Sequence, residues 1–297
     1  MPGSAPTPAR PPGAAHRPLR ITTGGGMTLA ADAWGDPEAE AVVFLHGGGQ
    51  TRHAWGDTAR ELAERGWYAV SLDLRGHGES DWSPDGSYRL DAFVEDLRAV
   101  LGGLGRPATL VGASLGGMTA LVAAGEEPRS DVRALVLVDI APRMERSGAL
   151  RIVSFMLARP EGFASLEEAA DAVAAYQPHR ERPRDTRGLE KNLRLGPDGR
   201  WRWHWDPRFL MGVGVPHAGQ TPNRLDEAAR ALAVPTLLVR GRLSDLLSEE
   251  GARHFLDLVP HARFADVSGA GHMVAGDRND LFTRAVVDFL TQLPATA

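Results

Sequence analysis

A serine lies between two glycines in the segment GASLG, which spans residues 112–116. An apolar run at 108–111 precedes it and predicts a buried strand, and a small, apolar stretch at 115–124 follows and predicts a helix. A strand, a sharp turn carrying serine and a helix together present a hydroxyl at the end of a sheet. Glycine suits the flanking positions because the turn brings the chain close to itself and a Cβ would clash. A plain glycine-rich turn would need neither this strand nor this helix, so the pattern favours Ser114 as a nucleophile.

A serine hydroxyl is a weak nucleophile, and it needs a base within hydrogen-bond reach and an acid that orients the base. The chain has ten histidines, and His272 stands in the loop SGAGHM, at 268–273, after the last predicted strand. A loop of small residues can carry an imidazole back over the strand ends. A surface histidine is the plain alternative. Position and chain order favour His272 as the base.

Two aspartates are candidates for the acid. Asp245 lies just after the predicted strand 236–239, in the segment GRLSD, and Asp139 lies at the end of the predicted strand 134–140. Functional groups gather on loops at the carboxyl ends of strands in open α/β sheets. Asp245 is favoured because it is on such a loop, whereas Asp139 is inside an apolar run. Either carboxylate has a plain alternative role as a helix cap or a turn residue.

The segment HGGG at 46–49 follows the predicted strand 41–45 and is a candidate oxyanion hole. Glycines let backbone N–H groups approach a substrate oxygen closely. The expected donors are the N–H of Gly48 and the N–H of Leu115, the residue after the nucleophile. Gly49 is a candidate substrate contact, and His46 is expected to be structural. A glycine-rich turn without a ligand is the alternative.

Strands and helices alternate over most of the chain, which predicts an α/β fold with a mostly parallel sheet flanked by helices. Pieces at 19–23 and 27–34 predict an antiparallel hairpin at the sheet edge. The expected organisation is a disordered N-terminal extension at 1–18, a core at 19–142 and 231–297, and an inserted helical cap at 143–230. The expected strands are 41–45, 68–74, 108–111, 134–140, 236–239 and 262–267, and the expected helices are 55–65, 90–101, 115–124, 249–258 and 279–290.

The cap range shows helical patterns at 148–158, 165–176 and 185–193, with no buried strand among them. We expect it to lie over the strand ends and to wall the substrate pocket, with Phe155, Met156 and Trp203 as candidate contacts. Three tryptophans alternate with polar residues in WRWHW, at 201–205, which predicts a short extended segment. Packing of the cap on the core explains these rings somewhat better than a pocket wall does.

These residues together resemble the α/β-hydrolase fold superfamily over 19–293. The resemblance rests on HGGG at 46–49, DLRGHGES at 73–80, the segment at Ser114, and Asp245 and His272. It implies a hydrolase similar to the branch of capped serine esterases and cofactor-free haloperoxidases, in which the RGHG stretch is structural, so His77 is not expected to be catalytic. Epoxide hydrolases and haloalkane dehalogenases use aspartate where this chain has serine, which disfavours both.

Composition limits the classes of partner. A formal charge of −5 gives no reason to expect nucleic acid or an anionic membrane surface. The chain has no cysteine, which excludes disulfides and thiolate chemistry. We expect no cofactor and no metal, and neither a signal peptide nor a run of about 18 apolar residues is present, so a cytoplasmic location is expected. The sequence does not decide whether the protein forms a homo-oligomer.

The predicted function is therefore a serine esterase that acts on small-molecule carboxylic esters through an acyl-enzyme intermediate. The same residues also suit perhydrolysis, as in the haloperoxidase-like enzymes, or hydrolysis of lactones or carbon–carbon bonds. A non-enzymatic ligand receptor on the same fold is the alternative from another class. The triad together with the oxyanion glycines favours turnover.

Overall fold

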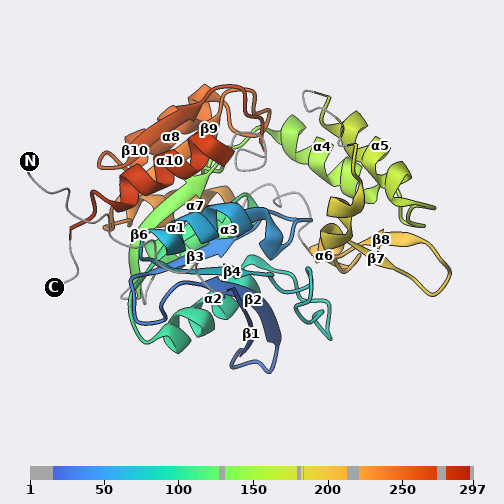
Figure 1. Cartoon of the computed structure of the whole chain (residues 1–297). Helices are drawn as coiled ribbons and strands as arrows, with labels where there is room; N and C mark the ends of the chain where they lie inside the picture. The colour runs from blue at the N-terminus through green and yellow to red at the C-terminus, as the bar shows by residue number, and fades with distance from the viewer. Residues whose placement is uncertain are drawn as a thin grey trace, which may run out of the picture.

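The computed structural model describes residues 16–126, 131–178, 182, 184–212, 221–272 and 279–294. Within this part of the chain, eight strands form one sheet in the order β1-β2-β4-β3-β5-β6-β9-β10 (Figure 1). Strands β1 and β2 form an antiparallel hairpin at one edge, as predicted, and β2 is antiparallel to β4. The strands from β4 to β10 are parallel to their neighbours, which confirms the predicted fold class. The bounds are β1 Arg17–Thr22, β2 Thr28–Trp34, β3 Ala41–Leu45, β4 Tyr68–Leu72, β5 Ala108–Ala113, β6 Val132–Val138, β9 Thr236–Gly241 and β10 Arg263–Val267.

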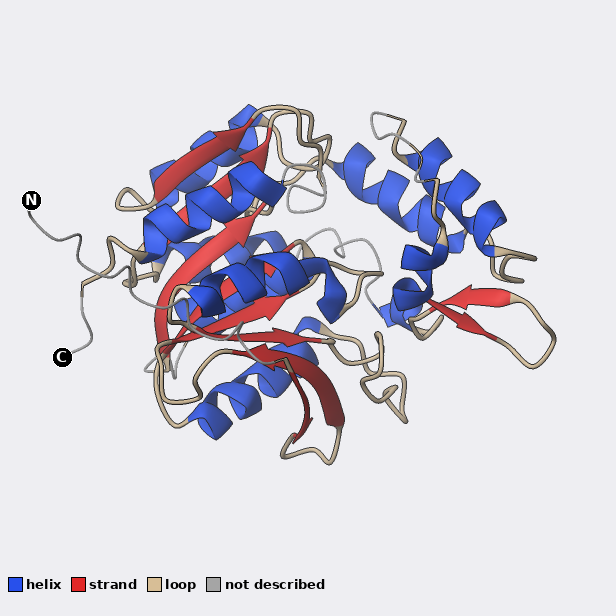
Figure 2. Cartoon of the chain, viewed as in Figure 1, coloured by secondary structure: helices blue, strands red, loops and turns tan. Residues whose placement is uncertain are grey.

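Helices cover both faces of the sheet (Figure 2). Apolar side chains alternate along the central strands, so that Val42 and Phe44 pack under one layer of helices while Val43 and Leu45 pack under the other. Burial on both faces is why these strands are continuous apolar runs. One layer holds α1 Gly56–Glu64, which follows the 3-10 turn η1 Arg52–Trp55, and α10 Asn279–Leu290; the other holds α2 Leu90–Leu104, α3 Leu115–Gly125, α7 Thr221–Arg230 and α8 Glu249–Leu258.

The segment between β6 and β9 carries a group of short elements that lies to one side of the sheet, beyond the strand ends (Figure 1). Within the predicted extended segment of alternating tryptophans, Trp201–Trp203 form β8, which pairs with β7, and Trp205 forms an isolated bridge with His77. Helix α7 falls in the sequence range assigned to the cap, but it packs on α3: a Cβ at Gly125 would lie 2.2 Å from the Ala228 oxygen. The cap elements are α4 Arg146–Leu157, α5 Leu166–Tyr176, the 3-10 helix η2 Arg187–Asn192, β7 Leu193–Leu195, β8 Trp201–Trp203 and α6 Phe209–Gly212.

Two strand ends differ from the sequence prediction in ways that matter for the site. Strand β5 runs on to Ala113, so Ser114 follows it directly. Strand β6 ends at Val138 rather than at 140, because Asp139 has a φ of 51° and leaves the extended conformation. At the N-terminus, residues 1–15 of the predicted extension lie outside the described residues, and Arg17 already belongs to β1.

Two features are absent from the described ranges. None of the helices there is both long enough and apolar enough to span a bilayer. No group of three or more His, Asp or Glu side chains there is arranged to hold a metal ion.

Candidate active site

Ser114 stands at a strained turn between β5 and α3. Its φ of 47° and ψ of −114° are unfavourable for a residue with a side chain. The turn is also crowded, because a Cβ at Gly112 would lie 2.5 Å from the Gly116 oxygen, and one at Gly116 would lie 2.4 Å from the Leu45 oxygen. The glycines therefore serve the close approach expected from the sequence. In the described part of the chain nothing hydrogen-bonds to the Ser114 hydroxyl, which leaves it free for another partner.

Asp139 stands at the end of the neighbouring strand. Ala113 of β5 is the register partner of Val138 of β6, so the next residues, Ser114 and Asp139, follow adjacent strand ends. Among the described residues, these two alone are non-glycine residues with positive φ, at 47° and 51°. Backbone strain of this kind costs on the order of 1–3 kcal/mol and concentrates at functional sites.

The His272 ring contacts Asp139. Its Nδ1 lies 2.8 Å from Asp139 Oδ2, and the carboxylate is fully buried. The loop after β10 can approach this closely because β9 ends in glycine: a Cβ at Gly241 would lie 2.2 Å from the Gly271 oxygen. The Leu243 N–H also donates to the Ala270 oxygen at 2.8 Å, which ties this loop to the loop after β9.

The structure corrects the acid that the sequence favoured. Asp245 does not pair with His272 but forms an ion pair with Arg151 of α4, at 2.6 Å. Its side chain is 34% exposed, whereas that of Asp139 is 0% exposed. The sequence disfavours Asp139, the alternative acid, because it falls inside the predicted strand 134–140. The early end of β6 removes that objection.

The predicted oxyanion donors are the N–H groups that the surrounding loops leave unused. The Gly47 N–H donates to Gln50 Oε1 at 2.9 Å, and the Gly49 N–H donates to His77 Nε2 at 3.0 Å. Between them, the Gly48 N–H makes no hydrogen bond within the described residues. Leu115 begins α3, and an N–H at the first position of a helix has no intrahelical partner.

Two buried histidines shape the HGGG loop and are structural, as expected. His46 donates from Nδ1 to the Gly47 oxygen at 2.8 Å and accepts the Leu74 N–H on Nε2 at 3.0 Å. His77 donates from Nδ1 to the Arg75 oxygen at 3.0 Å and accepts from Gly49. Burial lowers the pKa of His46 to about 4 and that of His77 to about 3, so both rings are neutral at neutral pH.

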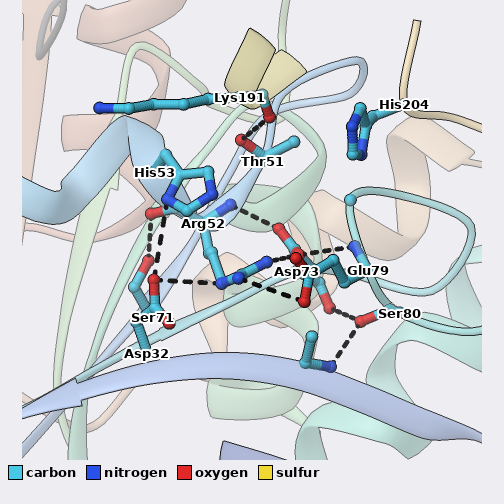
Figure 3. A network of polar contacts seen from close by, with 12 residues as sticks. Asp32, Thr51, Arg52, His53, Ser71, Asp73, Glu79, Ser80, Lys191 and His204 are labelled. Carbon is cyan, nitrogen blue, oxygen red and sulfur yellow. Dashed lines mark hydrogen bonds and ion pairs between the residues drawn. The ribbon is translucent and has the colours of Figure 1, made fainter. Parts of the chain in front are cut away.

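A buried charge network anchors the chain just after this loop (Figure 3). The Arg52 backbone N–H donates to Asp73 Oδ1 at 2.6 Å, and its guanidinium pairs with Asp73 and, at 3.1 Å, with Asp32. Asp73 also accepts the Glu79 N–H at 2.9 Å. Thr51 donates to Asn192 Oδ1 at 3.0 Å and so links the loop to the cap. Removing one partner of such a buried pair is costly, so the network fixes the loop.

Cap side chains lie against the HGGG loop. A Cβ at Gly49 would lie 3.0 Å from Met156 Cε and 3.2 Å from Trp205 Cζ3. A Cβ at Gly48 would lie 3.2 Å from Phe209 Cζ. Apolar atoms of Met156 in α4, of Trp205 just after β8 and of Phe209 in α6 therefore lie next to the candidate oxyanion loop.

The other two predicted cap contacts form a second aromatic layer. Trp203 stacks on Trp205, with ring centroids 5.1 Å apart and planes at 9°. Phe155 stacks on Tyr176 at 4.2 Å and contacts Trp203 at 5.8 Å. Phe155 and Trp203 thus support the rings next to the loop, while Met156 touches the loop itself.

Sequence reasoning missed Phe209 and Ser244. Phe209 starts the short helix α6, and no periodic pattern marks a helix of four residues. Ser244 donates to Asp139 Oδ2. The sequence indicates Ser244 only by its place in GRLSD, directly before Asp245.

The fold and the family comparison agree. The family model described as alpha/beta hydrolase fold matches residues 40–278, which is most of the chain. The chain belongs to this family.

Similar proteins include the esterase Rv0045c of Mycobacterium tuberculosis, which is 34% identical over 258 residues, or 84% of this chain and 82% of that protein. A crystal structure of that esterase has a TM-score of 0.73 and 31% identity, covering 95% of this chain and 93% of the other. The structure of E-2-(acetamidomethylene)succinate hydrolase has a TM-score of 0.81 with 24% identity, covering 93% of this chain and 100% of the other, and shows the shared fold.

Proposed function

We propose that this protein is a serine hydrolase that cleaves carboxylic esters of small molecules, with Ser114 as nucleophile, His272 as base and Asp139 as acid. The observation that carries the proposal is the hydrogen bond of 2.8 Å between His272 Nδ1 and Asp139 Oδ2, beside the strained Ser114 turn. The named esterase at 34% identity supports the ester as the substrate class.

The contact with Asp139 assigns the two nitrogens of His272. Because the buried carboxylate only accepts, Nδ1 carries the proton and donates it. The neutral ring then has its lone pair on Nε2, and that nitrogen takes the proton of the Ser114 hydroxyl as the oxygen attacks the ester carbonyl. The protonated ring later gives this proton to the leaving alcohol. Asp139 stabilises the transient imidazolium, and water releases the acyl group by the same steps.

The negative charge on the attacked carbonyl oxygen needs donors that are already oriented. The N–H groups of Gly48 and Leu115, which have no partner among the described residues, are suited to this role, and Leu115 adds the positive end of the α3 dipole. The apolar side chains of Met156, Trp205 and Phe209 beside the glycine loop lower the local dielectric, which strengthens both hydrogen bonds. They also favour an ester with an apolar acyl or alcohol group.

The test combines ester turnover with labelling of the nucleophile. Wild-type protein mixed with 4-nitrophenyl esters of increasing chain length should release a burst of nitrophenol and then turn over steadily, and a fluorophosphonate should label Ser114 stoichiometrically. Ser114→Ala should lose about 10⁴- to 10⁶-fold in kcat and all labelling. Ser154→Ala, which changes an exposed serine of α4, should behave as wild type. Binding of esters without turnover would favour the receptor alternative and overturn the proposal.

A further inference from the structure

The Asp139 carboxylate accepts hydrogen bonds from three groups. The Gly241 N–H donates to Oδ1 at 3.0 Å, while His272 Nδ1, at 2.8 Å, and the Ser244 hydroxyl both meet Oδ2. Within the described part of the chain, no arginine or lysine pairs with this carboxylate. A fully buried negative charge is thus stabilised by neutral donors alone until His272 becomes protonated. Each of these donors must be well placed, because an unsatisfied buried charge is costly.

The direction of the Ser244 hydrogen bond follows from its other contacts. The Leu246 N–H and the Leu247 N–H both donate to Ser244 Oγ, each at 3.1 Å. A hydroxyl has two acceptor sites and one proton. Since two backbone donors fill the acceptor sites, the proton is directed at Asp139 Oδ2. The Ser244 N–H donates to the Gly241 oxygen at 2.9 Å, which closes the loop and fixes the side chain.

We propose that Ser244 is a positioning residue for the candidate triad, which holds Asp139 Oδ2 at the place where it receives the His272 Nδ1 proton. The inference rests on the proposed function. Without the hydroxyl, the carboxylate can turn about its Cβ–Cγ bond, since among the described residues only the Gly241 N–H would then hold it besides His272. The imidazole would then lose the fixed partner that sets the orientation of its ring. Ser244 acts on the rate through Asp139 and touches no substrate, so KM is expected to stay close to the wild-type value.

The chain offers a matched control in the same loop. Ser248 caps α8, and its side chain accepts the Gly251 N–H at 3.2 Å. Ser248→Ala removes a serine hydroxyl and leaves one backbone donor unpaired, where Ser244→Ala leaves two, but Ser248 does not contact Asp139. Thermal unfolding of both variants compares their structural cost directly.

The experiment measures kcat and KM on a 4-nitrophenyl ester together with the far-downfield NMR signal of the His272 Nδ1 proton, assigned by its loss in His272→Gln. Ser244→Ala should lower kcat about 10- to 100-fold with little change in KM, and should shift or broaden the signal. Ser244→Thr, which keeps the hydroxyl, should restore most of kcat and the signal. Ser248→Ala should change neither.

Three results would overturn the inference: a Ser244→Ala enzyme with kcat within twofold of wild type and an unchanged signal, a kcat loss that Ser248→Ala shares, or a loss that Ser244→Thr does not restore. Absence of ester turnover in the wild-type protein would instead overturn the proposed function. In that case the His272 signal in the same variants still decides whether Ser244 positions Asp139.

Discussion

The candidate catalytic residues of the core and the side chains of the cap meet at the carboxyl ends of the strands. Different kinds of interaction hold the two regions in place. In the core, Ser114, Asp139 and His272 are set by strained backbone, by glycines in close contact with carbonyl groups and by buried hydrogen bonds. The cap is held by stacked aromatic rings and by ion pairs such as Arg151 with Asp245, whose side chains are 60% and 34% exposed. We therefore infer that the core fixes the candidate reacting groups to a single geometry, and we expect changes in the cap to affect the chemistry less.

The sharpest test of this division compares the two aspartates. Asp139→Asn should lower kcat by about 10⁴, because an amide can hold the wrong tautomer of His272. Asp245→Asn should change kcat only a few-fold, since it loses an exposed ion pair with the cap. Steady-state kinetics on one ester decides between them. A large loss in Asp245→Asn with an active Asp139→Asn would restore the acid that the sequence favoured.

The buried histidine of the core should make stability depend on pH. The pKa of His77 is about 3 in the native state because of burial, and about 6.5 when unfolded. As pH falls below about 6.5, the unfolded state takes up a proton that the native state refuses, so stability is lost by about 1.4 kcal/mol per pH unit from this group. His77→Gln removes this contribution. Urea unfolding from pH 7 to 5 should show the difference between wild type and variant shrinking as pH falls, and parallel curves would contradict the expectation.

In the cap, Met156 should control substrate size. Its Cε lies beside Gly49, so Met156→Ala opens space next to the candidate oxyanion loop. The ratio of kcat/KM for long over short acyl esters should rise about tenfold, or about 1.4 kcal/mol, which lies within the roughly 1–3 kcal/mol of discrimination expected in an apolar pocket. Leu157→Ala is the matched control, because the neighbouring Leu157 is 56% exposed. Equal scaling of every ester would mean that the cap is only a scaffold.

The ion pair between Arg151 of the cap and Asp245 of the core should contribute little to the free energy of unfolding. A double-mutant cycle of Arg151→Ala and Asp245→Ala, read from chemical unfolding, should give a coupling of about 0.2–1 kcal/mol, as is usual for an exposed pair. A coupling well above 2 kcal/mol would contradict this expectation and would mean that α4 is held to the core by a strong interaction.

Much of the fold was predictable because its signals are local. The central strands are apolar runs, helices such as α8 and α10 are amphipathic, and β3, α8 and α10 have the predicted bounds. Strand ends were less certain. Whether a strand stops at Val138 or two residues later depends on the φ of Asp139, which is set by contacts with distant loops.

The same limit explains the site. The GASLG pattern predicts Ser114 and the loop of small residues predicts His272, because in both cases the backbone conformation requires small residues within a few positions of the side chain. Which carboxylate meets the imidazole depends on the close approach of Gly241 to Gly271, which are 30 positions apart in the sequence. The cap contacts of Met156 and Phe209 arise from packing between segments that carry no shared motif.

The two positive φ angles of Ser114 and Asp139 also bear on how this protein can be engineered. Glycine adopts such angles at little cost, so replacing either residue with glycine would relieve on the order of 1 kcal/mol of strain while removing a group that we propose to take part in the reaction. A library screened for heat resistance alone would therefore enrich inert variants at these two positions. Directed evolution of a more robust catalyst must pair every thermal selection with a selection for turnover.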